Sequence, residues 1–474
     1  MILDNYDDYN VFKTTFRAYD IRGIFNENLT PQSHFRVGLA WGTFLQNEKT
    51  LDPKNDFIFI SYDTRKTSPL LSHAFAAGVM ATGINIEYSG EPLQFGPCMF
   101  TACERKAFAS AFITASHLPP EWNGVKFYYG SGVGFSEEDN MNIRDIFLDG
   151  NFESVDWKNV GQMTIINLKK EYQDYLSSKF SLKKKLKVVI DCGNGASCLS
   201  APAVLESIGL DVIPIFCDVD PTFPNRSSEP NEESLKILAK KVQAEKADFG
   251  VGFDGDGDRA VIVDNKGRVL LADITGLIIA KYMLKEYPKL NRILANVECS
   301  LLLEKVLSNI AIIDRIKVGH TFLTQDAQTK TDTLIGIESS GHMVFPTIFL
   351  FDDAMIIPLK LAEILSAQSI TLAEIVDELP ILYKRKIAVK CPDEIKFEVI
   401  AELLDMFRTR YKEITDIDGV GISFGTESWV LIRASNTGPK IRITIEAESD
   451  KQVDELLSNF RKSLEDKIDE LEKK

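Results

Sequence analysis

The sequence lacks several features that would place the chain in particular classes. No run of about eighteen apolar residues occurs, so no membrane-spanning segment is expected. The first ten residues are acidic and do not resemble a signal peptide. The seven cysteines are scattered and form no CxxC pair. In a large acidic chain this pattern indicates reduced, mostly buried thiols, and we expect a cytoplasmic protein.

Basic side chains are also fewer than acidic ones. The 474 residues include 54 basic and 69 acidic side chains, which give a net charge of −15. This balance argues against nucleic acid or an anionic membrane as a partner. An anionic substrate would have to be attracted by local basic loops. The length implies several domains with ample core.

Five apolar runs typical of strands end in polar, Gly-rich or charged loops: 57–65, 110–117, 187–195, 249–259 and 334–342. Helical patterns lie between them, as at 69–81, 231–246, 274–286 and 353–367. Strands that alternate with helices predict α/β units with largely parallel sheets. In such sheets ligands gather at the loops beyond the strand C-termini. The C-terminal residues 450–474 have the apolar spacing of an amphipathic helix, expected to pack on its own domain.

The most informative loop follows the fourth of these runs and reads DGDGDR. Asp254, Asp256 and Asp258 alternate with glycines, so the backbone can fold tightly and direct all three carboxylates at one point. Three like charges at close range repel strongly unless a cation lies among them. Ligands that are all oxygen favour a hard ion, Mg²⁺, with Mn²⁺ or Ca²⁺ also compatible. Metals held in this way commonly act on phosphate.

The same loop has a simpler interpretation as a turn, because Asp-Gly between apolar runs is a hairpin signal. Three carboxylates in five residues followed by Arg259 favour the metal site. An EF-hand does not fit, because Arg259 stands where its loop needs Gly and Asn265 where it needs Glu.

A second polar loop, ITASHLPPEWNGVKFYY (113–129), places Ser116 and His117 just after an apolar run. Two prolines and an Asn-Gly turn stiffen the chain beyond them, and Lys126 returns on the next run. A stiff loop can present a hydroxyl at a fixed point. A Ser-His pair alone is common in ordinary turns. Of the five histidines, His117, His320 and His342 lie in polar, Gly-containing segments, whereas His34 and His73 lie in helix-like stretches.

These loops resemble the motifs of one family, the α-D-phosphohexomutases. TASHLPPEWNGVK is similar to its active-site serine loop and DGDGDR to its metal loop. GIESSGH (336–342) is similar to its sugar-binding loop and RASNTGPKIRI (433–443) to its phosphate-binding loop. FRAYDIRG (16–23) matches the N-terminal motif of the phosphomannomutase/phosphoglucomutase branch. The five motifs occur in family order and span nearly the whole chain.

The resemblance implies four domains around a central cleft. Three related α/β domains with mixed, largely parallel sheets would carry the serine loop (1–158), the metal loop (159–266) and the sugar loop (267–382). A smaller α+β domain built on an antiparallel sheet (383–474) would carry the phosphate loop.

The resemblance also implies an activity, the interconversion of hexose 1-phosphate and hexose 6-phosphate, with mannose or glucose as the hexose. Ser116 would carry a phosphoryl group, and a hexose 1,6-bisphosphate would be both intermediate and activator. Mg²⁺ would be bound by Ser116, Asp254, Asp256 and Asp258. The implied catalytic residues are Ser116, Lys126, Arg17, His117, Arg259 and His320. The implied substrate-binding residues are Glu338, Ser340, His342, Arg433, Ser435, Asn436, Thr437, Lys440 and Arg442. Lys126 would be the base, with a pKa lowered by nearby cations.

Two departures from the family pattern leave alternatives open. Leu118 stands where the family has Asn, and Glu298 where many members of this branch have a phosphate-contacting Lys. The first removes an amide beside the nucleophile, and the second places a negative charge near the phosphate unless its loop points away. A phosphoglucosamine mutase, a catalytically impaired phosphosugar-binding protein and a metal-dependent phosphatase are the alternatives. The sequence does not decide the hexose, nor between a monomer and a homodimer.

Overall fold

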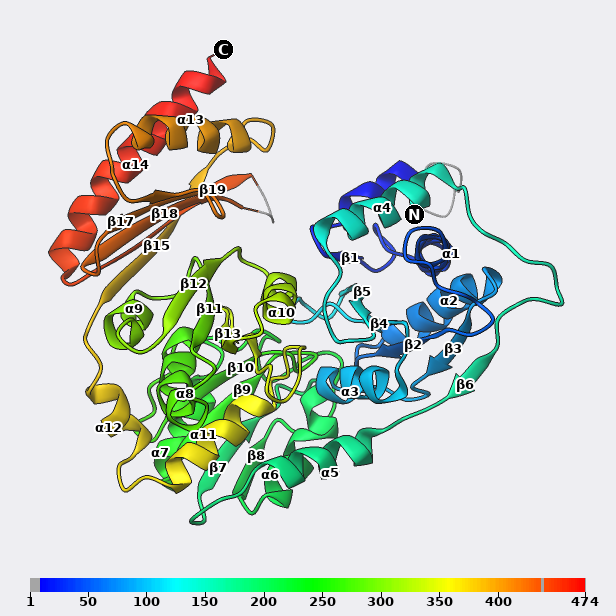
Figure 1. Cartoon of the computed structure of the whole chain (residues 1–474), viewed down its shortest axis with the longest axis horizontal. Helices are drawn as coiled ribbons and strands as arrows, with labels where there is room; N and C mark the ends of the chain where they lie inside the picture. Colours follow the sequence, from blue (N-terminus) through cyan, green and yellow to red (C-terminus); the bar gives the residue numbers. More distant parts are fainter. Residues whose placement is uncertain (1–8, 436–438, 474) are drawn as a thin grey trace.

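The computed structural model describes residues 9–435 and 439–473, which form four units, each built on its own sheet (Figure 1). The first sheet has the order β1-β5-β4-β2-β3-β6. Its strands are β1 (Asp20–Ile24), β2 (Phe57–Tyr62), β3 (Asn85–Tyr88), β4 (Ala109–Ile113), β5 (Trp122–Tyr129) and β6 (Met163–Ile165). Its helices are η2 (Tyr9–Thr15), α1 (Pro31–Asn47), α2 (Ser68–Ala81), α3 (Phe95–Arg105) and α4 (Glu137–Asp149). Strands β2, β3, β4 and β6 run parallel, and β5 is antiparallel to β1 and β4.

The second and third units have four-stranded sheets of the same mixed kind, in the orders β10-β9-β7-β8 and β12-β11-β13-β14. The second comprises α5 (Lys169–Lys179), β7 (Lys187–Asp191), η3 (Ala196–Leu199), α6 (Ala201–Ser207), β8 (Asp211–Ile215), α7 (Lys236–Glu245), β9 (Phe249–Phe253) and β10 (Ala260–Asp264). The third comprises α8 (Ala272–Glu286), β11 (Arg292–Asn296), α9 (Leu302–Leu307), β12 (Ile312–Ile316), α10 (His320–Thr329), β13 (Thr333–Ile337), β14 (Met343–Val344), α11 (Ile356–Ser366) and α12 (Leu372–Asp377). One strand of each sheet is antiparallel to its neighbour, β10 to β9 and β14 to β13.

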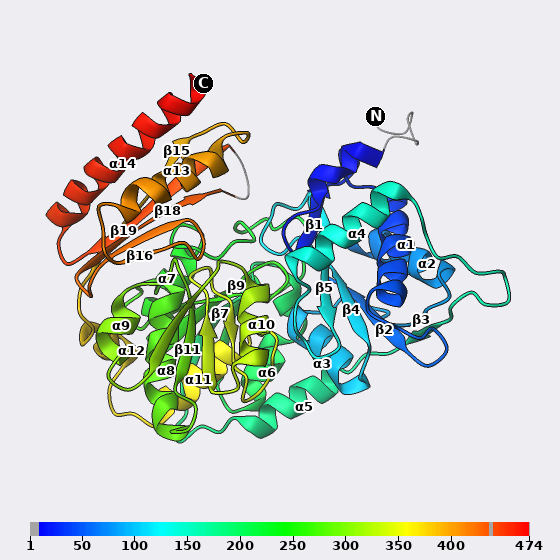
Figure 2. The ribbon, with the colours of Figure 1, turned by 45° about the horizontal axis from the view of Figure 1, so that its top comes forward.

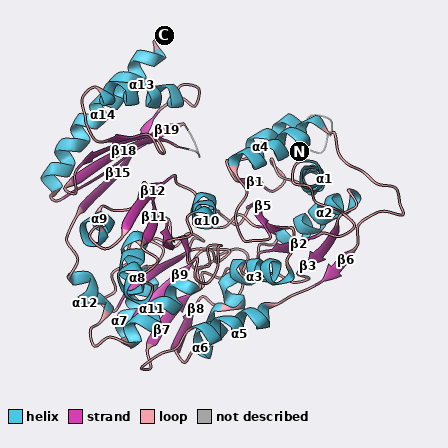
Figure 3. Cartoon of the chain, in the orientation of Figure 1, coloured by secondary structure: helices cyan, strands magenta, loops and turns pink. Residues whose placement is uncertain are grey.

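The C-terminal unit has a fully antiparallel sheet, β15-β19-β18-β17-β16. It comprises β15 (Tyr383–Lys390), α13 (Lys396–Arg408), β16 (Ile414–Thr415), β17 (Val420–Phe424), β18 (Ser428–Ala434), β19 (Lys440–Ala447) and α14 (Asp450–Glu472). Both helices lie on the face of the sheet that is turned away from the other units (Figures 1 and 2). The expected fold is confirmed: three α/β units with largely parallel sheets and an antiparallel C-terminal unit with helices on one face (Figure 3).

The distribution of buried apolar residues shows which units are joined most firmly. One continuous cluster runs through the first three units, from Phe59 through Val188 and Ile278 to Leu365. The C-terminal unit has a core of its own and meets the third unit through a small cluster of Val297, Leu301, Trp429 and Leu431. The first three units therefore form one scaffold, and the C-terminal unit is attached to it over a smaller apolar contact.

A domain boundary is expected at residue 158, but strand β6 of the first sheet lies beyond it. This strand pairs with β3 in parallel. The first sheet therefore extends to residue 165. None of the described helices combines the length and the apolar character needed to span a bilayer.

Helix α14 packs on its own unit, as its apolar spacing predicts. Its buried residues are Val453, Phe460, Leu464, Ile468 and Leu471. The Phe460 ring lies 5.3 Å from the Phe407 ring of α13 and 5.6 Å from the ring of Tyr411, measured between centroids. Ser449 caps the helix by accepting a hydrogen bond from the Gln452 backbone N–H.

Replacement of Phe460 by Ala should reduce the free energy of unfolding of the C-terminal unit by about 3–5 kcal/mol, because it leaves a cavity between two helices. Urea unfolding followed by circular dichroism measures this loss. The exposed Lys462 of the same helix provides the control, because Lys462→Ala should change stability by less than about 0.5 kcal/mol. Equal losses in the two variants would contradict the packing described here.

Candidate active site

Loops from all four units enclose one cavity of about 810 Å³. Its lining includes Tyr19 and His117 from the first unit, Thr222 and Arg259 from the second, Glu298, Glu338 and Ser340 from the third, and Arg433, Ser435 and Arg442 from the fourth. A hollow of about 380 Å³ shares Tyr19, His117, Arg259 and Glu338 with it and extends to Arg17, Lys126, His320 and His342. Most of the predicted site residues therefore surround one connected space.

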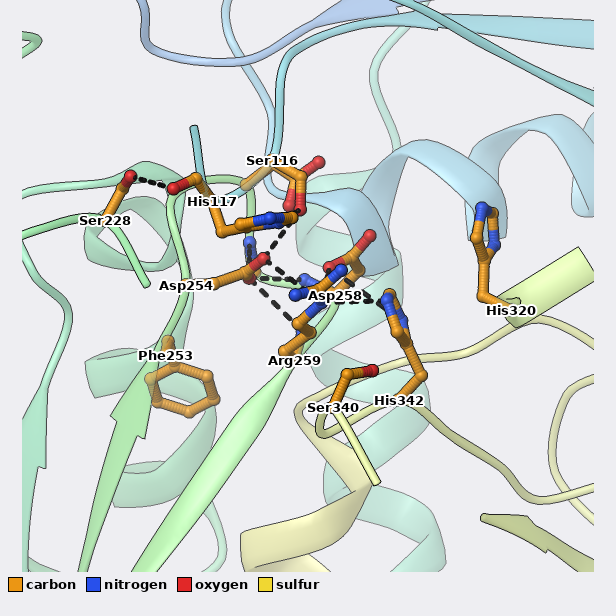
Figure 4. Close-up of polar contacts among 12 residues, drawn as sticks. Ser116, His117, Ser228, Phe253, Asp254, Asp258, Arg259, His320, Ser340 and His342 are labelled. Atoms are coloured by element: carbon orange, nitrogen blue, oxygen red, sulfur yellow. Dashed lines mark hydrogen bonds and ion pairs between the residues drawn. The ribbon is translucent and has the colours of Figure 1, made fainter. Parts of the chain in front are cut away.

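The acidic loop after β9 brings its three carboxylates together. One oxygen each of Asp254, Asp256 and Asp258 lies within 4.8 Å of the others, and all three residues are buried. Figure 4 shows Asp254 and Asp258 of this loop beside Ser116 and Arg259. Both glycines of the loop are required. Gly257 has a φ of +79°, and a Cβ on Gly255 would lie 2.4 Å from the Ser116 carbonyl oxygen. The loop can thus approach the serine loop closely only because it alternates carboxylates with glycines.

This cluster suits a hard divalent cation. Burial and the neighbouring Asp258 and Asp256 raise the pKa of Asp254 well above its ordinary value. One oxygen each of Asp256 and Asp258 is buried and accepts no hydrogen bond from any described residue. Buried carboxylate oxygens that face one another without donors are the ligand set that Mg²⁺ prefers. The residues present therefore fit the metal that the family resemblance implies.

Ser116 faces the metal loop from the end of β4. Its Oγ donates a hydrogen bond to Asp254 Oδ2 at 2.9 Å, and its backbone N–H donates to Thr114 Oγ1 at 2.9 Å. The residue has a φ of +49°, a left-handed conformation that is uncommon outside glycine. Such a conformation persists only where the surroundings enforce it, and it often marks a functional position. The serine hydroxyl is thus aimed at the acidic loop by backbone geometry.

The residue that enforces this geometry is Arg65, which was missed as a site residue. It is 1% exposed, and its guanidinium donates to four backbone carbonyl oxygens of the serine loop: Ser116 at 2.7 Å, Leu118 at 2.7 Å, Pro119 at 2.6 Å and Trp122 at 3.2 Å. Asp63 orients the guanidinium from 3.1 Å. The sequence does contain a signal for Arg65, because the first strand run ends in the polar sequence Asp-Thr-Arg, at the edge of the sheet where ligands gather.

The second unit also holds the serine loop. Ser228 Oγ lies 2.6 Å from the His117 carbonyl oxygen and 2.9 Å from that of Leu118. The amide that Leu118 lacks relative to the family pattern is therefore not the main support of this loop. Its carbonyl oxygens are held from two sides, by Arg65 and by Ser228.

Lys126 lies on β5 and is almost fully buried against the acidic loop. Its Nζ donates to Asp256 Oδ2 at 3.0 Å and to Asp258 Oδ2. Burial alone would lower the pKa of Lys126, but the two carboxylates outweigh it and raise the pKa. The expectation that neighbouring cations depress this pKa is wrong for this arrangement, because the nearest charges are negative.

His117 shows the opposite effect. Its Nδ1 lies 3.4 Å from Ser116 Oγ. The guanidinium of Arg259 and burial both lower the pKa of His117 well below its ordinary value. The imidazole is therefore neutral near neutral pH, and because the Ser116 hydroxyl donates to Asp254, His117 can meet Ser116 Oγ as a donor through Nδ1–H.

Arg259 begins a buried chain of polar contacts that leads away from the acidic loop. Its Nε–H donates to His342 Nε2 at 2.8 Å, so the proton of a neutral His342 lies on Nδ1. That nitrogen is 2.5 Å from Asp352 Oδ2. His320 is stacked on His342 with ring centroids 5.2 Å apart. Asp352 was missed, since the loop between β14 and α11 has no pattern that singles it out.

The predicted sugar-binding loop is arranged around Glu338. Its Oε2 accepts from the Gly319 N–H at 2.8 Å, and its Oε1 accepts from Ser340 Oγ at 2.5 Å. Glu338 and Ser340 both line the cavity. Each carboxylate oxygen keeps a second lone pair that can accept from a ligand hydroxyl.

The predicted phosphate loop is only partly gathered at the cavity. Arg433, Ser435 and Arg442 line it, whereas Lys440 does not. Asn436 and Thr437 lie outside the described residues. Glu298 does not point away from the site: it lines the cavity, and its Oε1 accepts from Arg433 at 3.1 Å.

Four family models match the chain, and together they cover most of it. They describe phosphoglucomutase/phosphomannomutase alpha/beta/alpha domains I, II and III at residues 13–154, 170–267 and 272–383, and the C-terminal domain at 387–463. The chain belongs to the phosphoglucomutase/phosphomannomutase family. It is a phosphohexomutase, an enzyme that transfers phosphate within a sugar phosphate.

Relatives and solved structures agree with this assignment. A phosphoglucomutase/phosphomannomutase of Thermococcus kodakarensis is 32% identical over 459 residues, which are 96% of this chain and 99% of that protein. A probable phosphoglucosamine mutase of Pyrococcus horikoshii is 31% identical over 462 residues, with 96% and 99% covered. The crystal structure of a family member from Burkholderia thailandensis superposes with a TM-score of 0.86 at 25% identity, covering 96% of this chain and 98% of that one.

More distant structures share the fold. The N-acetylphosphoglucosamine mutase of Aspergillus fumigatus, solved in complex with GlcNAc-6P and magnesium, has a TM-score of 0.61 at 14% identity and covers 96% of each chain.

Replacement of Arg65 by Lys should lower kcat by about 10²-fold with a smaller change in KM, since lysine can pair with Asp63 but cannot hold four carbonyl oxygens at once. Steady-state kinetics together with the thermal midpoint measure the effect. Arg105→Lys is the matched control, because Arg105 belongs to the same unit and pairs with Glu87 far from the serine. Wild-type turnover in Arg65→Lys would show that the clamp does not position Ser116.

Proposed function

We propose that this enzyme interconverts the 1- and 6-phosphates of mannose and glucose through a phosphorylated Ser116. The observation that carries the proposal is the 2.9 Å contact between Ser116 Oγ and Asp254 Oδ2, which is buried beside His117 and Arg259 in the lining of the four-unit cavity. The hydroxyl is thus held against one of the three clustered carboxylates. A phosphoryl group on that oxygen would lie beside the proposed metal ligands.

The proposed reaction transfers one phosphoryl group from Ser116 to the sugar and then another from the sugar back to Ser116. The sugar hydroxyl attacks the phosphorus on Ser116, the bond to Ser116 Oγ breaks, and a hexose 1,6-bisphosphate forms. The bisphosphate turns end for end and returns its other phosphate to Ser116. The same bisphosphate, bound from solution, would phosphorylate an empty Ser116 and so act as activator. Closure of the units over the cavity would exclude water as the competing acceptor.

The proposed metal ligands are Asp254, Asp256, Asp258 and the oxygen on Ser116. Mg²⁺ bound there would neutralise charge on the transferred phosphoryl group. Arg259 lies next to this cluster, 4.0 Å from Asp254 and 3.9 Å from Asp258, and can hold a non-bridging oxygen of the phosphate.

Lys126 remains the proposed acid–base group, although its raised pKa makes it a proton donor in the free protein. In each transfer its ammonium can donate a proton to the oxygen that leaves, and the resulting amine can accept the proton of the hydroxyl that attacks, so Lys126 returns to its starting state. Neutral His117 can orient the serine hydroxyl, and His320 orients His342 through ring stacking. Arg17 is exposed at the edge of the smaller hollow, where it can meet the phosphosugar.

The proposed substrate contacts come from the third and fourth units. Glu338 and Ser340 would read two neighbouring sugar hydroxyls, which is compatible with both orientations of the bisphosphate. His342, held by Asp352, would support the same loop. Arg433, Ser435 and Arg442 would anchor the phosphate that does not react, and Asn436, Thr437 and Lys440 stay predicted contributors.

We also propose the domain bounds, the cellular location and the partner of the enzyme. We place the domains at 1–158, 159–266, 267–382 and 383–474, with the first sheet extending across the first boundary through β6. All seven cysteines are free, which supports a cytoplasmic location. The partner is a small phosphosugar, with no nucleic acid or membrane involved.

A phosphoglucosamine mutase is the second candidate, because several of the curated relatives carry that name. A panel of glucose, mannose and glucosamine 6-phosphates, assayed under one Mg²⁺ condition with a bisphosphate activator, decides between them. We expect the largest kcat/KM for mannose or glucose phosphate. A preference of about tenfold or more for glucosamine phosphate would select the second candidate, and no turnover of any of the three would exclude both.

Ser116→Ala should abolish the extra mass of one phosphoryl group seen by intact mass spectrometry and lower kcat by about 10⁴-fold or more, because the nucleophile is lost. Ser131→Ala, at an exposed serine of the same unit that does not line the cavity, should retain both. A phosphate-binding protein without catalysis would bind sugar phosphate but show no phosphorylated Ser116. A phosphatase would release inorganic phosphate faster than it isomerises sugar.

Removal of divalent metal by a chelator should abolish turnover, and added Mg²⁺ should restore it, because the transferred phosphate then lacks its counter-charge. Asp256→Asn should weaken the Mg²⁺ activation constant by at least about tenfold. Turnover that survives chelation unchanged would contradict the proposed metal role of the acidic loop.

A further inference from the structure

Glu298 makes contacts that the phosphate of a substrate would be expected to make. It follows β11 in the third unit, is 7% exposed and lines the cavity. Its two carboxylate oxygens accept from two cations of the C-terminal unit, Oε1 from Arg433 Nη1 at 3.1 Å and Oε2 from Lys386 Nζ at 2.7 Å. Arg433 and Lys386 also line the cavity. A side chain of the third unit thus occupies the cationic anchor of the fourth.

The carboxylate is charged in this position. Burial alone would raise the pKa of Glu298, but Lys386 and Arg433 outweigh it and lower the pKa. Arg433 is committed on its other side as well, since its Nη2 lies 3.1 Å from Asp418 Oδ2. Both terminal nitrogens of the proposed phosphate anchor therefore face protein carboxylates in the free enzyme.

We propose that Glu298 is an internal competitor of the substrate phosphate, which must displace its carboxylate from Arg433 and Lys386 before it can bind there. This inference rests on the proposed function, because it takes the ligand to be a sugar phosphate. A phosphate and a carboxylate use the same guanidinium nitrogens, so they exclude one another. Once displaced, Glu298 remains close to the phosphate and repels it. Both effects weaken the anchor.

A weakened anchor suits the proposed reaction. The bisphosphate intermediate must release one phosphate from this anchor and present the other, all within a single catalytic cycle. Binding that holds the intermediate too firmly lowers its free energy without lowering that of the transition state. Glu298 can take back Arg433 and Lys386 as the phosphate leaves, so the buried Arg433 does not lose the partner of its Nη1.

Glu298 is not required to hold the two units together. Glu446 of the fourth unit accepts from Ser300 Oγ at 2.7 Å and from the Leu301 N–H at 2.8 Å. Lys384 Nζ donates to the backbone oxygen of Glu298 at 2.7 Å, a contact that any residue at this position would keep. The apolar cluster of Val297, Leu301, Trp429 and Leu431 completes the contact. Neutralising the Glu298 side chain should leave this interface in place.

The test is Glu298→Gln, which keeps the shape and removes the charge. Binding of inorganic phosphate and of glucose 6-phosphate is measured by titration calorimetry in the Ser116→Ala background, at fixed ionic strength and Mg²⁺. We expect Kd to fall about tenfold for both ligands. In the enzyme with Ser116 intact, KM for glucose 1-phosphate should fall by a similar factor, with kcat unchanged or lower because release slows. Glu298→Met should shift Kd in the same direction, which guards against an effect peculiar to Gln.

Glu229→Gln is the matched control, because Glu229 is an exposed carboxylate on the same cavity that contacts neither Arg433 nor Lys386. Its effect on Kd should stay below about twofold. Weaker or unchanged phosphate binding in Glu298→Gln overturns the inference, as does an equal gain in Glu229→Gln. Glucosamine 6-phosphate is titrated in the same way, and weaker binding confined to this ligand would overturn the inference and assign Glu298 to the sugar's ammonium group. If the wild type turns over no sugar phosphate, the proposed function fails, but the calorimetric comparison still decides the role of Glu298.

Discussion

Three carboxylates buried on one short loop are the constraint around which the rest of the site is built. Asp254, Asp256 and Asp258 repel one another, and burial removes the water that would screen them. In the free protein their compensation comes from other parts of the chain: Lys126 from the first unit, and Arg259 from the following residue. Lys126 is thus a cation that reaches this loop across the boundary between two units. The electrostatic requirement of the acidic loop therefore also brings the serine loop to it.

The two ends of the site differ in how firmly they are held. Ser116 and the acidic loop are fully buried, and Arg65 fixes the serine loop through its backbone. These elements lie on units that share one continuous apolar core. The cationic anchor around Arg433 belongs to a unit with a separate core. Phosphoryl transfer requires fixed distances at the reacting end, whereas the far end needs only charge to hold a phosphate. The first three units, which share one core, meet the requirement for fixed distances. The C-terminal unit, which has its own core, supplies the charge.

Much of this could be predicted because strand ends and glycine spacing are local properties. The runs before Ser116 and Asp254 fix where each loop begins, and each loop follows the carboxyl end of a strand in its own largely parallel sheet, where ligands gather. Contacts between residues of different units cannot be predicted from such local properties. The pKa of Lys126 shows the difference, since its direction depends on two carboxylates that lie more than 100 residues away in sequence. Asp352 could not be found at all, because it lies in an irregular loop with no periodic pattern and contacts His342 and His320, which are distant in sequence from one another.

The two departures from the family pattern have different consequences because they act through different atoms. At position 118 the structure uses the backbone carbonyl oxygen, to which Arg65 and Ser228 donate. Every residue type supplies that oxygen, so leucine in place of asparagine removes an amide but not the support of the loop. At position 298 the structure uses the side chain itself, whose two oxygens meet two cations. A change of residue there alters the charge balance of the anchor directly. Leucine at position 118 is therefore the milder departure. Glutamate at position 298 bears on how tightly the proposed anchor holds phosphate.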